Sequence, residues 1–406
     1  MIVTGSQEIA TDLFDTRSSI YSDRTCPPAV KESSLMNWGN TPVVTGYNDT
    51  WRNYRRVMHN RLNKHAISVF RQSQQSQARL LLQRLLNKSH DSYDSRELNR
   101  ELYQAISTTL LESIYGYSPQ NLDDPFVVGM KEAVSNFSMA TISTNFLVNI
   151  FPTLKYVPSW FPGADWKRTL RQWGKQKDKI VEGLLDWTKS HMALDNDNVS
   201  MVASLLEDIN VWGLDEPEAN SIISEVGASL FGKSILVFVL AMVLFPDVQV
   251  KAQEEIDRIV GVGQLPAMDD QPHLPYLGPV VQEVLRWQPV LPLGIPHVCT
   301  KENEYNGYLI PRDAIVLGNI WYIINGDVAK RENIQIQRLS IQTVSSTRMC
   351  HICSHSAGDD GNACPGMHYA QASLSITIAS ILATFNSSSE FTALHDVIVR
   401  RPTMNL

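Results

Sequence analysis

The sequence of 406 residues lacks a long apolar run, a strongly basic segment and a repeat of fixed period. The longest apolar stretch covers residues 234–245 and ends before Pro246, so it is too short to cross a bilayer and predicts a buried helix. A formal net charge of −7 argues against nucleic acid as a partner. No linker-like segment divides the chain, and we expect one domain over residues 1–406.

Cysteine is also scarce, with five in the chain, and no secretory leader is recognisable. This usage indicates a reducing compartment rather than a disulfide framework. Two of the five, Cys350 and Cys353, have Cys-x-x-Cys spacing with His355 close by, which is a spacing that zinc sites use. One hypothesis for the chain is therefore a zinc-stabilised interaction protein that also uses Cys364.

Cys364 carries the most chemical information in the sequence. Cys364, Pro365 and Gly366 lie directly ahead of residues 367–385, whose apolar positions recur at helical spacing. A thiol at a helix N-terminus is close to free backbone N–H groups and to the positive end of the helix dipole, which favour the thiolate. A thiolate held against a buried helix is suited to ligate the metal of a large cofactor. The alternative is a buried structural cysteine beside a tight turn.

The residues around Cys364 resemble a known cofactor loop. Residues 357–366, AGDDGNACPG, are similar to the haem-binding loop of cytochrome P-450 proteins. Gly358, Asp360 and the Cys-Pro-Gly at 364–366 fit the family pattern. Ala357 differs from the aromatic residue usual in the family, and Asn362 differs from the usual basic residue that pairs with a haem propionate. The resemblance implies haem b, with Cys364 as the axial ligand of the iron.

A second segment agrees with this resemblance. Glu283 and Arg286 have the Glu-x-x-Arg spacing of the family's helix ahead of the haem loop, within an apolar-periodic run over residues 277–285. Positions three apart on a helix are neighbours, so the two side chains can pair. Prolines end this helix, and the Asn-Gly at 306–307 then predicts a hairpin, in the order that the family also has. By the same resemblance His297, ahead of the hairpin, is a candidate cofactor contact.

A third segment supplies candidate ligands for the haem propionates. Trp51, Arg55 and His59 fall four residues apart and predict one helix face that combines an aromatic N–H donor with a fixed cation. In the family a Trp and an Arg at this spacing contact the propionates, which favours Arg55 over Arg56. The alternative is a basic surface helix that recognises the acidic face of a redox partner.

Two segments depart from the family pattern. The helix over the haem normally carries an acid and an alcohol that relay protons. An ungapped alignment of residues 226–235 has Ser229 and Leu230 at those positions, and an alignment that puts residues 228–232 just upstream of the motif leaves the motif deleted. We therefore expect the proton relay to be absent, with Ser229 as the remaining catalytic candidate. Further on, only Arg338 is left of the segment that completes the family's Glu-Arg-Arg network.

The chain as a whole is identified as a member of the cytochrome P-450 family, with a pattern like that of fungal enzymes of secondary metabolism, apparently truncated and degenerate. The resemblance implies a mainly α fold with small β regions that lacks part of the N-terminal sheet region. It also implies a monooxygenase that inserts one oxygen atom of O2 into a hydrophobic small molecule, using electrons from an NADPH-dependent reductase. A catalytically impaired haem-binding relative, or a lipophile carrier, is the alternative.

The resemblance also bears on location. Family members of fungal type usually begin with a membrane anchor, and this sequence is expected to start beyond it. Residues 146–161, rich in aromatic residues and proline, resemble the region that in the family dips into the bilayer surface and borders substrate access. The family implies the surface of the endoplasmic reticulum membrane, and the missing anchor leaves a soluble cytoplasmic protein as the other expectation.

Overall fold

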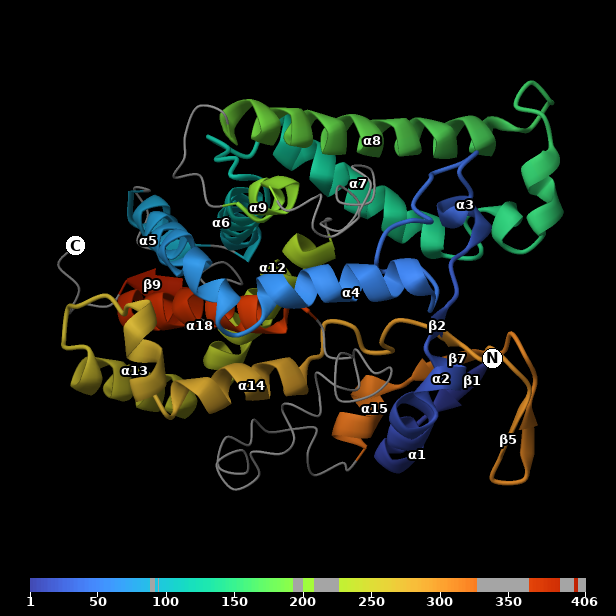
Figure 1. Ribbon diagram of the computed structural model, residues 1–406. Coiled ribbons are helices and arrows are strands. Elements are labelled where there is room, and N and C mark those ends of the chain that lie inside the picture. Colours follow the sequence, from blue (N-terminus) through green and yellow to red (C-terminus); the bar gives the residue numbers. More distant parts are fainter. Residues whose placement is uncertain are drawn as a thin grey trace. The chain divides into compact units, whose positions relative to one another are not determined.

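The computed structural model describes residues 1–87, 92–93, 95–192, 200–207, 226–326, 365–387 and 398–400. These residues form a mainly helical fold with small sheets, which confirms the predicted fold class (Figure 1). Contacts divide the chain into two compact units. Unit 1 comprises Met1–Ser22, Leu62–Thr109 and Leu230–Leu406, and unit 2 comprises Asp23–Arg61 and Leu110–Ser229.

Unit 1 is built around α18 (Met367–Thr384), the helix that the apolar periodicity predicts. It packs against α5 (Arg71–Asn87), α13 (Pro246–Ile259) and α14 (Leu277–Trp287). The C-terminal half of α18 is buried on every side, because these helices cover it from different directions. This explains why its sequence stays apolar all round toward the end instead of showing one stripe.

Buried amides of α13 fix the end of α18. The Gln253 side-chain nitrogen donates to the carbonyls of Leu382 and Phe385 at 3.1 Å each. Gln249 exchanges two hydrogen bonds with the backbone of Ser387. These bonds satisfy carbonyls that a helix end leaves without internal partners.

The other helical elements of unit 1 are short, or continue into unit 2. They are α1 (Gln7–Thr11), a π-helical turn η1 (Asp12–Thr16), α2 (Ser18–Tyr21), the 3₁₀ helices η2 (Ala66–Phe70) and η5 (Met268–His273), α6 (Ser95–Tyr115), α12 (Val226–Leu244) and α15 (Ile320–Asn325).

Helix α12 contains the apolar stretch that the sequence analysis predicts to be buried. Phe238, Val239 and Met242 are fully buried, and the helix ends at Leu244 because Pro246 begins α13. In the described residues no single helix is long and apolar enough to span a membrane. The part of α12 from residue 234 passes that test only together with α13, as a pair bent by 107°.

The sheets of unit 1 are small. Strand β7 (Ile315–Gly318) pairs in parallel with β1 (Ile2–Thr4) and antiparallel with β4 (His297–Val298). Strand β9 (Ile398–Arg400) pairs antiparallel with both β3 (Ser92–Tyr93) and β8 (Phe385–Ser387).

The predicted hairpin is confirmed. Strands β5 (Asn303–Tyr305) and β6 (Tyr308–Ile310) pair antiparallel. Asn306 and Gly307 between them have φ angles of 50° and 79°, as a type I′ turn requires.

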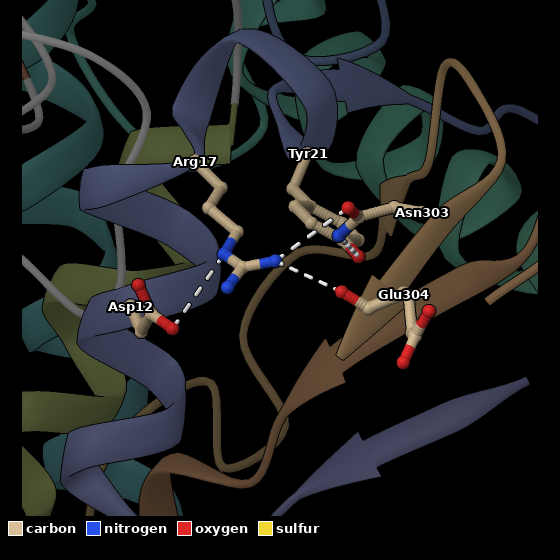
Figure 2. A network of polar contacts seen from close by, with 5 residues as sticks. All are labelled: Asp12, Arg17, Tyr21, Asn303 and Glu304. Carbon is tan, nitrogen blue, oxygen red and sulfur yellow. Dashed lines mark hydrogen bonds and ion pairs between the residues drawn. The ribbon is translucent and has the colours of Figure 1, made fainter. Parts of the chain in front are cut away.

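A polar network ties this hairpin to the N-terminal helices (Figure 2). The Arg17 guanidinium donates to the Glu304 carbonyl at 3.1 Å and lies over the Tyr305 ring. The Asn303 amide donates to the Tyr21 hydroxyl at 2.8 Å. Tyr21 is fully buried, so the network fixes the hairpin against the core of this part of unit 1.

Unit 2 is organised by two long helices that lie side by side, α7 (Pro125–Thr141) and α8 (Asp165–Met192) (Figure 1). Their apolar faces enclose a core with α3 (Pro28–Lys31) and the fully buried Trp38. Gly174 of α8 is required here, because a Cβ at this position would lie 2.8 Å from the carbonyl oxygen of Met36. The remaining elements are β2 (Asp23–Arg24), α4 (Asp49–Leu62), the 3₁₀ helices η3 (Leu147–Asn149) and η4 (Pro152–Tyr156), and α9 (Met201–Glu207).

Candidate functional site

The structure describes the side chains of some of the predicted site residues. Trp51 and Arg55 lie in unit 2, and Glu283, Arg286 and His297 lie in unit 1, so each group is described within its own unit. The predicted iron ligand and several other candidates lie outside the described residues: Arg338, Cys350, Cys353, His355, Ala357, Asn362 and Cys364. Ser229 is described as a backbone position on α12, without its side chain.

Helix α4 presents the predicted aromatic and cationic face. The Arg55 guanidinium carbon lies 5.2 Å from the centre of the Trp51 ring, and both side chains are half-buried. Arg56 is exposed, and so is His59, which therefore does not share the half-buried environment of Trp51 and Arg55 that the four-residue spacing predicts. The choice of Arg55 over Arg56 as the inward cation therefore agrees with their burial.

A second arginine, which the sequence analysis did not single out, lies near Arg55. Arg24 of β2 is half-buried, and both its burial and the charge of Arg55 lower the pKa of its guanidinium to about 10. Two cations that repel each other in a partly buried place are stabilised by an anion between them. The pair is thus suited to hold a carboxylate, such as a haem propionate.

The turn ahead of α4 holds Arg24 in place. Asp23, its neighbour, accepts a hydrogen bond from the Tyr47 N–H at 2.9 Å. Gly46 permits this approach, because a Cβ there would lie 2.5 Å from the Asp23 carboxylate. Arg24 and Arg55 are 31 residues apart in the sequence, so neither helical nor strand spacing could predict that they lie close together. Arg24 follows Tyr21 and Ser22, which the structure shows to be buried.

The Glu283–Arg286 pair is a buried structural element of unit 1. Two hydrogen bonds of 2.7 Å join the carboxylate to the guanidinium, and a third Arg286 nitrogen donates to the Asn325 side-chain oxygen at 2.8 Å. The Glu283 side chain is 1% exposed and that of Arg286 15% exposed. The predicted pairing is confirmed. The hydrogen bond from Arg286 to Asn325 joins α14 to the end of α15.

His297 occupies a buried position in strand β4. Its ring packs against the Phe14 ring, with the ring centres 4.8 Å apart. Its strand pairing with Val316 of β7 fixes the backbone at this point. These contacts define a rigid imidazole, and its role as a cofactor contact stays a prediction.

The start of α18 is where the sequence predicts it. Gly366 precedes the first helical residue, Met367, and its carbonyl accepts the Ala370 N–H at 2.8 Å. A Cβ added to Gly366 would meet nothing within 4 Å. The segment that carries Cys364 therefore leads directly into the N-terminus of a long buried helix.

Metal binding by other side chains finds no support in the described part of the chain. No group of three or more His, Cys, Asp or Glu side chains there is arranged to hold a metal ion. The zinc hypothesis rests on Cys350, Cys353, His355 and Cys364, which all lie outside that part.

The fold is that of a cytochrome P450. Two solved structures of a zebrafish cytochrome P450, one with abiraterone and one with progesterone, match with TM-scores of 0.76 and 0.75. Each match covers 98% of this chain and 93% of the other, at 19% and 21% sequence identity.

Sequence relatives identify the family. The cytochrome P450 family model matches residues 1–329. Cytochrome P450 monooxygenase COX2 of Coprinopsis cinerea is 34% identical over 401 residues, which cover 95% of this chain and 74% of the relative. Cytochrome P450 monooxygenase 58 of Postia placenta is 32% identical over 395 residues, covering 95% and 73%. The chain belongs to the cytochrome P450 family and is by this relationship a P450-type monooxygenase.

Proposed function

We propose that this chain is a haem-thiolate monooxygenase that oxidises a hydrophobic small molecule with O2 and reductase-delivered electrons. The observation that carries the proposal is the half-buried pair of Arg24 and Arg55 beside Trp51, a cationic cluster suited to contact carboxylates. Haem b meets this need with its propionates. The family model ends at residue 329, so the iron ligand itself is part of the proposal.

The residues around the cofactor have separate tasks. Cys364, which precedes α18 in the sequence, would hold the haem iron through its thiolate, a form that the N–H groups of a helix N-terminus favour. Arg24, Arg55 and Trp51 of unit 2 would bind the propionates. His297 of unit 1 would be a cofactor contact by the family resemblance alone. When bound, haem supplies the chemistry that reduces O2 and transfers one oxygen atom to a C–H or C=C bond, while the other leaves as water. The chain's own contribution is to orient the haem and the substrate and to exclude water from the site.

A membrane surface is the proposed location. The apolar segment, residues 146–161, exposes a set of large apolar side chains that would otherwise be expected inside: Leu147, Ile150, Phe151, Tyr156, Trp160 and Phe161. Tyr and Trp are the side chains that favour the interface between water and lipid. The endoplasmic reticulum membrane fits this surface and the proposed use of hydrophobic substrates.

A redox partner with an acidic face is also proposed. Arg56 and His59 are exposed on α4, and the exposed Arg52 pairs with Asp49, the one acid of the helix. This surface is basic although the whole chain is acidic, which favours recognition of an NADPH-dependent reductase by charge.

One observation favours a second candidate function, that of a haem-binding carrier with little turnover. Residues 226–235 of α12 contain neither a carboxylic acid nor a threonine. A protein that binds haem and a lipophile without a proton relay would retain the fold and lose most of the rate.

The experiment that tests the proposal is reconstitution of the purified chain with haem, an NADPH-dependent reductase and a panel of lipophilic compounds. Incorporation of isotopically labelled O2 into a product supports the monooxygenase. Haem binding without labelled product supports the carrier. A chain that contains zinc and takes up no haem contradicts both.

A further inference from the structure

The backbone of the apolar segment is held from one side. The Lys167 ammonium donates to the carbonyls of Lys155 and Val157, the latter at 2.8 Å. The Arg168 guanidinium donates to the carbonyl of Ser159 at 2.8 Å. Three carbonyls at alternate positions are therefore bound by two consecutive residues in the first turn of α8.

Lys167 is an unusual residue to find in this place. It is 5% exposed, and lysine is almost never fully buried without a partner of opposite charge. In the described part of the chain its ammonium has these two carbonyls as partners and no carboxylate. Burial and the nearby Arg171 charge lower its pKa, so the charged form is held there at a cost in free energy.

The neighbouring charges have other partners. The Lys155 ammonium pairs with Glu32 at 2.9 Å, Arg168 pairs with Asp165, and Arg171 donates to the Ser34 carbonyl. None of these acids neutralises Lys167. Its contacts are thus directed to the backbone of the apolar segment and not to an ion pair.

Several large side chains of the segment are exposed next to these bonded carbonyls. Tyr156 is 76% exposed and Trp160 is 77% exposed, whereas Phe146 and Val148 at the start of the segment are buried. Irregular backbone can meet lipid only where the protein itself satisfies its polar groups, because hydrocarbon offers no hydrogen bonds. The hydrogen bonds from Lys167 and Arg168 meet that requirement for the carbonyls of Lys155, Val157 and Ser159.

We propose that Lys167 is a positioning residue for membrane contact, which holds the carbonyls of the apolar segment so that Tyr156, Trp160 and Phe161 meet a bilayer surface. The inference rests on the membrane location put forward under the proposed function. Arg168 acts in the same sense on Ser159 and is the weaker anchor, because its side chain is 57% exposed.

The test compares Lys167→Met with Lys175→Met, an identical change at an exposed position of the same helix. Two quantities are measured for the full chain. One is the fraction that sediments with phosphatidylcholine vesicles containing some phosphatidylserine, and the other is the rate of chymotrypsin cleavage after Tyr156 and Trp160. Hydrogen bonds from a charged group are lost in Lys167→Met, so cleavage should rise and vesicle affinity should fall by about tenfold or more. The Lys175 variant should match wild type within roughly twofold.

Further variants keep the outcomes distinct. Lys167→Arg restores a cation with several donors and should recover part of the vesicle binding. If Lys167→Met fails to fold, Arg168→Met, at an exposed side chain, should still raise cleavage of the segment. Wild type that does not bind vesicles would contradict the membrane location, while the cleavage rates would still decide the role of Lys167. Unchanged cleavage in both Lys167→Met and Arg168→Met would overturn the inference.

Discussion

The Glu283 carboxylate and the Arg286 guanidinium meet through two parallel hydrogen bonds of 2.7 Å, in a place where the carboxylate is 1% exposed. Such a bidentate pair combines charge with fixed geometry. Removing one partner of this buried pair is costly in free energy, because the charge of the other partner is then only partly compensated. The pair links α14 to Asn325 of α15 and so supports the region that precedes the cysteine loop in the sequence.

The first prediction is that Glu283→Gln lowers the free energy of unfolding by about 3–5 kcal/mol, since the change leaves Arg286 buried without its counter-charge. Urea denaturation of the variant and of wild type measures the difference. Asp313→Asn is the control, because Asp313 and Arg312 form an exposed pair at 3.8 Å that should contribute no more than about 1 kcal/mol. Equal, small losses in both variants would contradict the structural role of the buried pair.

The second prediction separates haem binding from folding. Arg24→Ala and Arg55→Ala should accelerate haem loss by about 10–100-fold, the effect of losing a hydrogen bond to a charged group. In the haem-free protein each change also removes the repulsion between the two cations, which offsets part of the contacts that it deletes. Transfer of haem to apomyoglobin and thermal unfolding of the apoprotein measure the two effects. Arg56→Ala is the control, and an equal effect there would show that the wrong face of α4 was chosen.

The third prediction concerns coupling. Because residues 226–235 lack the adjacent acid and alcohol that the family uses as a pair, proton delivery during turnover should be poor, since a positioned proton donor contributes about 10²–10⁴-fold in rate. We expect product to account for a minor share of the NADPH consumed and hydrogen peroxide for most of the rest. Both are measured in the reconstituted system. Near-stoichiometric coupling that Ser229→Ala abolishes would instead assign proton delivery to Ser229.

The fourth prediction is a dependence on pH in unit 2. The Tyr117 hydroxyl donates to Asp124 at 2.6 Å, and burial, this hydrogen bond and the Asp124 charge raise the pKa of Tyr117 to about 12. An unfolded tyrosine has a pKa of about 10. The native state therefore retains a proton that the unfolded state loses, so this stability is fully present below about pH 10 and falls as the pH rises toward 12.

Tyr117→Phe tests this directly. The difference in urea midpoint between wild type and variant should be constant below about pH 9 and should shrink at higher pH. Tyr308→Phe, at an exposed side chain, is the matched control for the loss of a tyrosine hydroxyl. A difference that is independent of pH would contradict the raised pKa.

Local periodicity was sufficient to predict several elements. The apolar spacing after Gly366 predicts α18, the Glu-x-x-Arg spacing predicts the pair on α14, and Asn306 with Gly307 predicts the turn. Each of these depends on residues close together in the sequence. The exposure of Arg56 and the partial burial of Arg55 also follow from helical spacing.

The remaining features depend on contacts between distant segments. Arg24 lies near Arg55 in a turn where the Asp23 carboxylate accepts the Tyr47 N–H, a contact between residues 24 positions apart. Lys167 is buried against carbonyls ten and twelve residues earlier, whereas lysine composition alone predicts exposure. The role of Cys364 could be proposed from the sequence, and it is the part of the site that now needs measurement.

The most direct test of the central claim is the absorption spectrum of the purified, reduced chain with carbon monoxide bound. The account predicts the Soret band typical of thiolate-ligated haem in wild type and its loss in Cys364→Ala, with Cys299→Ala, a buried thiol in unit 1, unchanged. An unchanged band in Cys364→Ala, or zinc in place of iron in the wild-type protein, would contradict it.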